Sequence, residues 1–387
     1  MMFYLIIFLF IKSIFSLRIQ YHPLEPRIAY IHDIKNINKI DHYEMSLLTE
    51  LFQKHPLLIF KNIDNISPNE FIDFVKDFDP DHDEEALLNP DNLTNQILQP
   101  FDQFPDCKHV APRGNIELNN YYNINHIKIK PSKGFINNYL WHVDLLGHET
   151  KLLNVITSFY IVNQPLIGGD TDFISGETIY ENLTPDEQIA CENILVEINK
   201  KKIINNQIMI DYAGVNRLED YTDSENVIIP ILFAPDNNKE KPRILIMPTF
   251  FEKVVGWNVK DSRSWINYFM NNKVLPHRVS IQWKKGDLAI FNNRRFIHSS
   301  TPARNYLDNR DSNERLLLQT FIPTKRPLLG IKPIESNIYS CYNLKWINDK
   351  DKSILSAHNT IKYAVSTSLK NNISSYNDKY YVLNKLV

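Results

Sequence analysis

The chain has 387 residues, of which 43% are hydrophobic and 12% aromatic, so it can bury a sizeable core. Its 43 basic and 45 acidic side chains give a formal net charge of −2. This balance, with no basic tract and no zinc-finger motif, argues against nucleic acid as a partner. The cysteines are Cys107, Cys191 and Cys341, an odd number without a disulfide framework, and they leave the cellular compartment open.

The amino terminus is almost wholly apolar from Phe3 to Leu17 and is broken only by Lys12 and two serines. This stretch is shorter than the roughly 20 residues of a membrane span. We expect residues 1–17 to be a secretory signal cleaved near Ser16-Leu17, although no basic segment precedes it; an uncleaved anchor or a buried strand are the alternatives. A signal or anchor would place the protein in the secretory pathway or on a membrane, and otherwise it would be cytoplasmic.

The first half of the chain predicts two helices and two strands. Residues 44–55 have the amphipathic pattern of a helix, and residues 56–60 are an apolar run typical of a strand. Ser67-Pro68-Asn69-Glu70 is a capping box with proline at the first helical position, which predicts a helix through about Lys76. The run from Leu152 to Val162 is rich in aromatic and β-branched residues and predicts a buried strand.

The second half alternates between strand and turn signals. A second capping box, Thr184-Pro185-Asp186-Glu187, predicts a helix toward Lys200, in an insert that we expect to cover the mouth of a functional site. The predicted strands are Val227–Phe233, Arg243–Met247, Val279–Trp283, Leu288–Phe291 and Arg315–Phe321. Gly286-Asp287 is predicted to be a hairpin turn between the third and fourth of these strands.

These elements together predict the fold class. Short strands separated by turns, with helices only at intervals, favour a mainly β fold with flanking helices, in the form of a double-stranded β-helix, that is, a jelly-roll or cupin-like barrel. We expect one such domain over residues 18–335, because β barrels commonly absorb this length as one unit. Residues 336–387 are more polar and are expected to form a C-terminal tail with one or two helices.

The run at residues 141–144, Trp-His-Val-Asp, carries the most informative motif of the chain. Side chains at positions n and n+2 of an extended segment point the same way, so His142 and Asp144 can chelate one ion. A second imidazole, His298, lies far downstream, where a facing strand could bring it close. Two imidazoles and one carboxylate are the ligand set of non-haem Fe(II) oxygenases. His148 is an alternative ligand, which we expect instead to lie in an exposed loop.

Two downstream blocks accompany this motif. From Gly168 the chain reads Gly-Gly-Asp-Thr-Asp-Phe-Ile-Ser-Gly, and from Phe291 it reads Phe-Asn-Asn-Arg-Arg-Phe-Ile-His-Ser-Ser-Thr-Pro. In this order, the motif and the two blocks resemble the taurine dioxygenase (TauD/TfdA) family of Fe(II)- and 2-oxoglutarate-dependent dioxygenases. The resemblance extends from about Pro56 to about Phe321.

The resemblance implies an activity and a set of site residues. It implies that His142, Asp144 and His298 are the iron ligands, and that Thr171 and Arg315 hold the cosubstrate 2-oxoglutarate. The enzyme would oxidise a small organic substrate with O2 and release succinate and CO2. Arg315 also has independent support, because the far carboxylate of the cosubstrate needs a planar, two-pronged donor, which a guanidinium provides.

One position departs from the family pattern. Members that oxidise sulfonates or carboxylates carry a second arginine four residues after the cosubstrate arginine, whereas this chain has Gln319 there. An uncharged amide cannot give a sulfonate a charge-assisted hydrogen bond, so we expect a substrate other than taurine. By the same analogy, Asn138 and Gln319 are candidate substrate-binding residues.

Two other functions stay open at this stage. The related butyrobetaine hydroxylases suggest a quaternary amine or amino acid as substrate, for which Tyr121, Tyr122 and Tyr139 are candidate members of an aromatic cage. From a different class, the barrel could bind a ligand or partner without turnover. The expected partners are therefore a small molecule and O2, with a membrane reached only through an uncleaved N-terminal segment; the oligomeric state is open.

Overall fold

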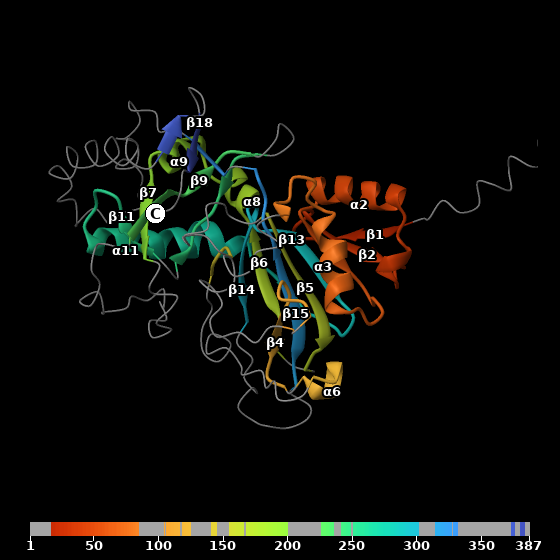
Figure 1. Ribbon diagram of the computed structural model, residues 1–387. Helices are drawn as coiled ribbons and strands as arrows, with labels where there is room; N and C mark the ends of the chain where they lie inside the picture. The colour runs from red at the N-terminus through yellow and green to blue at the C-terminus, as the bar shows by residue number, and fades with distance from the viewer. Residues whose placement is uncertain are drawn as a thin grey trace, which may run out of the picture.

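The computed structural model describes residues 17–84, 104, 106–116, 118–124, 141–144, 155–165, 168–199, 226–235, 241–248, 251–301, 314–326 and 328–331, and two strands at 373–375 and 380–383. Over these residues the protein is mainly β with flanking helices, as predicted (Figure 1). Within the same ranges, no helix has the length and apolar character needed to cross a membrane. The predicted signal or anchor, apart from Leu17, lies outside them.

The largest sheet has seven strands, and its centre contains the predicted buried strand of residues 152–162. That strand, β5, is buried along nearly its whole length and pairs antiparallel with a neighbour on each side. Among the described strands, only β2 and β3 pair in parallel. The spatial order is β1 (Arg18–Tyr21), β2 (Ile28–His32), β3 (Leu57–Phe60), β13 (Leu288–Asn292), β5 (Ile156–Asn163), β15 (Leu316–Ile322) and β4 (Ala111–Gly114).

One face of this sheet packs against helices α2 (His42–Lys54) and α3 (Pro68–Lys76) (Figure 1). Leu58, Ile290 and Leu318 of the sheet belong to the same buried cluster as Phe52 of α2 and Phe71 of α3. Both helices begin with a complete capping box, which the sequence predicted for α3. The helices therefore close the outer face of the sheet.

The opposite face packs against a three-stranded sheet in the order β12 (Val279–Ile281), β6 (Thr171–Ser175) and β14 (Phe296–Ser300). Ile59, Ala289 and Leu317 of the large sheet share a buried cluster with Phe173 of β6 and Phe296 of β14. Side chains alternate between the faces of a strand, so Leu317 and Leu318 reach different clusters. The two sheets thus form two layers around an apolar core.

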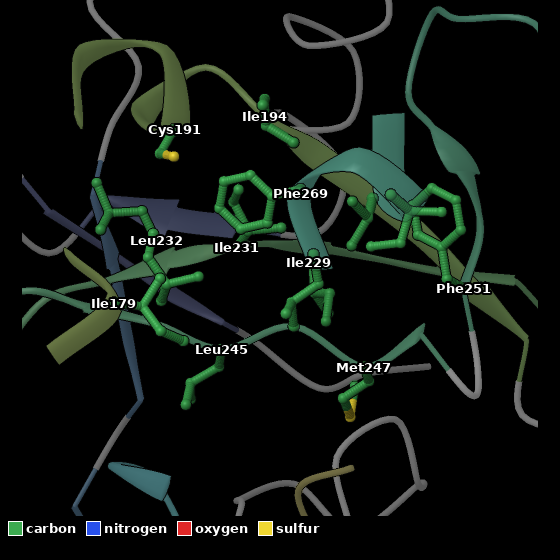
Figure 2. Packing of buried hydrophobic residues seen from close by; sticks show 14 of the residues in the cluster. Ile179, Cys191, Ile194, Ile229, Ile231, Leu232, Leu245, Met247, Phe251 and Phe269 are labelled. Carbon is green, nitrogen blue, oxygen red and sulfur yellow. The ribbon is translucent and has the colours of Figure 1, made fainter. Parts of the chain in front are cut away.

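A third buried cluster holds the other half of the protein together (Figure 2). It includes Cys191 of α9 (Pro185–Glu192), Ile229 of β8 (Asn226–Pro230), Phe251 of β11 (Phe251–Val254) and Phe269 of α11 (Val259–Phe269). β7 (Leu195–Asn199) is the middle strand of a small sheet with β11 and β8. This cluster lies on the side of the sheets opposite to α2 and α3 (Figure 1).

Two predicted elements differ from the structure in this region. The helix predicted toward Lys200 is α9, which starts at the predicted capping box but ends at Glu192. Asn193 ends it by donating its side-chain amide to the carbonyl of Ile189, and the β-branched run that follows forms β7. α9 packs into the third cluster, which also contains Trp141 and Val143, and residues 200–225 of the predicted insert lie outside the described residues.

The predicted hairpin at Gly286-Asp287 is also wrong. The turn exists, with Gly286 at a φ of 84°, but β12 pairs with β6, whereas β13 pairs with β3 and β5. The turn instead carries the chain from one layer to the other. It also buries Asp287, whose carboxylate pairs with Lys61.

The predicted strand Val227–Phe233 divides in two. β8 ends at Pro230 and β9 (Leu232–Phe233) joins a different sheet, in the order β10 (Arg243–Ile244), β9, β16 (Leu329–Ile331), β18 (Tyr380–Leu383) and β17 (Ile373–Ser375). Of two strands in the predicted tail, β18 pairs with β16 and β17 pairs with β18. The helices predicted there fall outside the described residues. Over the described ranges the four sheets do not close into one barrel.

Candidate metal centre

Three potential metal ligands meet where the segment 141–144 crosses β14. The backbones of His142 and His298 form an isolated antiparallel bridge, in which each residue's N–H donates to the other's carbonyl at 3.0 Å. One ligand atom from each of His142, Asp144 and His298 lies within 4.8 Å of the others. The structure therefore brings the predicted triad together although His298 lies far along the chain.

The alternation expected of the motif is present. Trp141 and Val143 are each 1% exposed and belong to the third cluster, whereas His142 and Asp144 are only partly buried and converge with His298. The two apolar residues hold the segment against the core, and this orients both ligands to the same side.

The three side chains already have the arrangement of a ligand set. His142 Nε2 lies 3.5 Å from Asp144 Oδ1, and His298 Nε2 lies 3.3 Å from Asp144 Oδ2. The His298 ring packs against Phe291 and Phe173, with ring centroids 5.0 and 6.0 Å away. Both Nε2 atoms thus face one carboxylate, and His298 does so from an aromatic wall.

The electrostatics of the site suit a divalent cation. Burial lowers the pKa of His298, against the opposing effect of Asp144, so its imidazole is neutral and able to ligate at neutral pH. Burial alone would raise the pKa of Asp144, but the two histidines more than offset this and keep it ionised. Two imidazoles and one carboxylate fit Fe(II), with coordination positions left for other ligands.

Two residues that the sequence did not single out hold Asp144 in place. Asn293, which is fully buried, accepts a hydrogen bond from the Asp144 backbone N–H at 2.9 Å and donates to its carbonyl at 2.8 Å. Thr157 Oγ1 of β5 donates to Asp144 Oδ2 at 2.9 Å. Asn293 belongs to the block that starts at Phe291, so the sequence placed it near His298. Nothing in the sequence indicated that it would bond to the backbone of Asp144.

The two predicted cosubstrate residues are both buried, and the glycine turn connects them. Thr171, at the start of β6, accepts a hydrogen bond from Trp283 Nε1 at 3.0 Å, which orients its hydroxyl. Gly169 has a φ of +75°, and a Cβ there would lie 2.9 Å from Gln164 Nε2 and 3.4 Å from the Arg315 guanidinium. Asn115 accepts from the Arg315 backbone N–H at 2.7 Å. The turn therefore needs glycine for its backbone conformation and for its close approach to Gln164, and it lies in contact with Arg315.

The candidate substrate residues have different outcomes. Gln319 is on β15, and its Oε1 accepts a hydrogen bond from Arg113 Nε at 2.9 Å. Tyr121 and Tyr122, in α6 (Asn119–Tyr122), pack against the cluster on the outer face of the large sheet, away from the metal ligands. Asn138 and Tyr139 lie outside the described residues, as does the alternative ligand His148.

Comparison with known proteins agrees with this site. The sequence profile described as "Taurine catabolism dioxygenase TauD, TfdA family" matches residues 20–320. A protein of Schizosaccharomyces pombe described as "Alpha-ketoglutarate-dependent xanthine dioxygenase xan1" is 24% identical over 371 residues, which cover 80% of this chain and 87% of that protein.

Solved structures share the fold. A taurine dioxygenase from Burkholderia xenovorans superposes with a TM-score of 0.55 at 15% identity, covering 81% of this chain and 93% of that one. AAD-2, solved in complex with Mn(II) and N-oxalylglycine, gives 0.53 at 14% identity, covering 81% and 99%.

The chain belongs to the TauD/TfdA family. It is a 2-oxoglutarate-dependent dioxygenase that acts on a small substrate and uses Fe(II), and the alternative of a barrel without turnover is not retained.

Proposed function

We propose that His142, Asp144 and His298 hold Fe(II), and that Arg315 and Thr171 anchor 2-oxoglutarate, for the oxidation of a small organic substrate other than taurine. The observation that carries the proposal is the convergence of the three ligand atoms within 4.8 Å. When bound, iron and 2-oxoglutarate supply the power to oxidise with O2, with release of succinate and CO2. The protein supplies geometry and a shielded pocket.

Each residue has a separate task in this proposal. Arg315, only 2% exposed, offers a planar pair of donors to the far carboxylate of 2-oxoglutarate. Thr171 donates its hydroxyl hydrogen to the same cosubstrate, since its oxygen already accepts from Trp283. Asn293 bonds to the backbone of Asp144 on both sides and so keeps its carboxylate pointed at the metal.

We further propose that the facing sheets belong to a jelly-roll barrel, supported by their shared core and by the likeness to taurine dioxygenase. The dioxygenase domain would span residues 18–335, with a tail at 336–387. The apolar composition from Phe3 to Leu17 supports a signal or anchor at residues 1–17, hence a secretory or membrane-anchored location.

The substrate is narrowed by two observations. The S. pombe relative is described as a xanthine dioxygenase, which makes an oxopurine a candidate substrate. A quaternary amine has less support as the substrate. Tyr121 and Tyr122, the described candidates for an aromatic cage, pack against the outer cluster and not beside the metal ligands. We therefore favour an oxygen-bearing small molecule over a quaternary ammonium compound.

The test is a screen for 2-oxoglutarate-dependent succinate release with purines, sulfonates, amino acids, betaines and fatty acyl compounds. Asp144→Ala should abolish release, and Asp73→Ala, which changes a carboxylate that is 67% exposed on α3, should not. Succinate release by Asp144→Ala at the wild-type rate would remove Asp144 from the centre. Taurine as the best substrate would refute the selectivity argument.

A further inference from the structure

Arg113 lies beside Gln319 on the same face of the large sheet. In the pairing of β4 with β15, Arg113 is opposite Leu317 and Ala111 is opposite Gln319. Residues opposite one another in a sheet share a face, as do residues two apart on one strand, so Arg113 and Gln319 are diagonal neighbours. Arg113 Nε donates to Gln319 Oε1 at 2.9 Å and joins the two side chains.

This face of the sheet is the one that meets the metal ligands. On the other side of β15, Gln319 is opposite Phe159 of β5. The next pair on the same face, two residues further along β15, is Phe321 with Thr157. Thr157 Oγ1 donates to Asp144 Oδ2 at 2.9 Å, so the face of Gln319 and Arg113 leads directly to a metal ligand. Leu317, on the same face between Arg315 and Gln319, lies in the apolar core between the two sheets.

The guanidinium is close enough to the centre to interact with it electrostatically. Burial lowers the pKa of Arg113, and the attraction of Asp144 opposes this, which leaves the pKa at about 10. Arg113 is therefore cationic at neutral pH. The positive charge that the family pattern places at position 319 is provided here from the neighbouring strand.

The hydrogen bond also fixes what the pair presents to a ligand. Since Gln319 Oε1 accepts from Arg113 Nε, the amide nitrogen points away from Arg113. The amide NH2 and the guanidinium offer donors and a positive charge, while the amide oxygen of Gln319 is turned toward Arg113. Such a pair suits an anionic or oxo group and disfavours a cation, which the guanidinium would repel.

We propose that Arg113, oriented by Gln319, is a substrate-binding residue, and that the substrate carries an oxygen acceptor group, either a carboxylate or a ring carbonyl. This inference rests on the proposed function, since it needs the substrate to lie beside the metal ligands. In this proposal Arg113, on the neighbouring strand, determines substrate selectivity in place of the second arginine of the family pattern.

The experiment measures binding by calorimetry under anaerobic conditions, with Fe(II) and 2-oxoglutarate present. The probes are xanthine and 2,4-dichlorophenoxyacetate, which carry the two acceptor groups, and choline, which carries a quaternary cation. The wild type should bind at least one of the first two more tightly than choline. Which of the two binds better identifies the acceptor.

Variants then assign the effect to the pair. Arg113→Gln should raise the dissociation constant of the best probe at least about tenfold, the loss expected when a charge-assisted hydrogen bond is removed. Gln319→Glu should weaken binding similarly, because it keeps an acceptor for Arg113 Nε and cancels the charge. Arg18→Gln is the matched control at a side chain that is 68% exposed, and it should bind like the wild type.

Several outcomes would overturn the inference. It fails if the wild type binds none of the acceptor probes, if it binds choline as tightly as the best of them, or if Arg113→Gln and Gln319→Glu bind like the wild type. Gln319→Glu keeps the test decisive even if Arg113→Gln does not fold. Failure of the proposed function would be seen in a separate measurement. The complex with Fe(II) and 2-oxoglutarate should absorb weakly in the visible through metal-to-ligand charge transfer, and if the proposed function were wrong, the wild type would lack this band.

Discussion

Asn293→Ala tests whether the metal centre depends on the residue that clamps Asp144. The change removes two hydrogen bonds, from the side-chain amide to the Asp144 carbonyl at 2.8 Å and from the Asp144 N–H to the side-chain oxygen at 2.9 Å. Each buried backbone group left unpaired costs about 1–3 kcal/mol, so the variant loses about 2–6 kcal/mol, shared between folding stability and metal binding. Removal of such supporting groups typically weakens metal affinity about 10- to 100-fold.

The assay is an Fe(II) titration at saturating 2-oxoglutarate without oxygen, alongside thermal unfolding. Asn292→Ala is the matched control, because the Asn292 side chain accepts from the Arg294 backbone N–H at 2.9 Å, whereas the side chain that pairs with the Asp144 backbone is that of Asn293. It should lose about 0.5–1.5 kcal/mol of stability and keep its Fe(II) affinity. The reasoning is refuted if Asn293→Ala binds Fe(II) as tightly as Asn292→Ala does.

Three further predictions follow from buried contacts. Arg315→Leu should raise the 2-oxoglutarate requirement at least about tenfold, since a charge-assisted hydrogen bond contributes about 1.5–3 kcal/mol; an unaltered requirement would mean that another cation anchors the cosubstrate. Trp283→Phe removes the donor to Thr171 but keeps an aromatic ring, so 2-oxoglutarate binding should weaken only a few-fold. Because Trp283 is buried in the core between the sheets, the smaller ring should also cost about 1–3 kcal/mol of stability in thermal unfolding. Lys61→Met leaves the buried Asp287 carboxylate without its cation and should cost about 3–5 kcal/mol at pH 7. Burial already raises the pKa of Asp287, so this deficit should shrink as the pH falls and the folded variant takes up a proton; a deficit that grows on acidification would contradict the assignment.

The metal ligands were predictable because their signal is local. The alternation of Trp141, His142, Val143 and Asp144 orients the pair by strand geometry alone, and the structure agrees. His298 needed the resemblance, since no periodicity links it to the first two. Asn293 was missed because its function depends on which backbone it meets, and sequence does not show a partner so far away.

The wrong predictions about the fold also arise from contacts between residues far apart in the sequence. Gly286-Asp287 is a correct turn, but a turn signal does not say whether the strands on either side pair, and here they join different sheets. Arg113 lies in a short Pro-Arg-Gly segment at the edge of a sheet and has no motif. Its relation to Gln319 comes only from the register of β4 and β15, so the sequence suggested a lost charge where the structure has one nearby.

The most direct test of the central claim is an anaerobic titration of the wild type and of His298→Ala with Fe(II) and 2-oxoglutarate, read by visible absorption. If His142, Asp144 and His298 hold the iron, the wild type should develop the weak metal-to-ligand charge-transfer band of the complex. His298→Ala should show no band at the same concentrations. A band of unchanged intensity in His298→Ala would contradict the assignment of the metal centre.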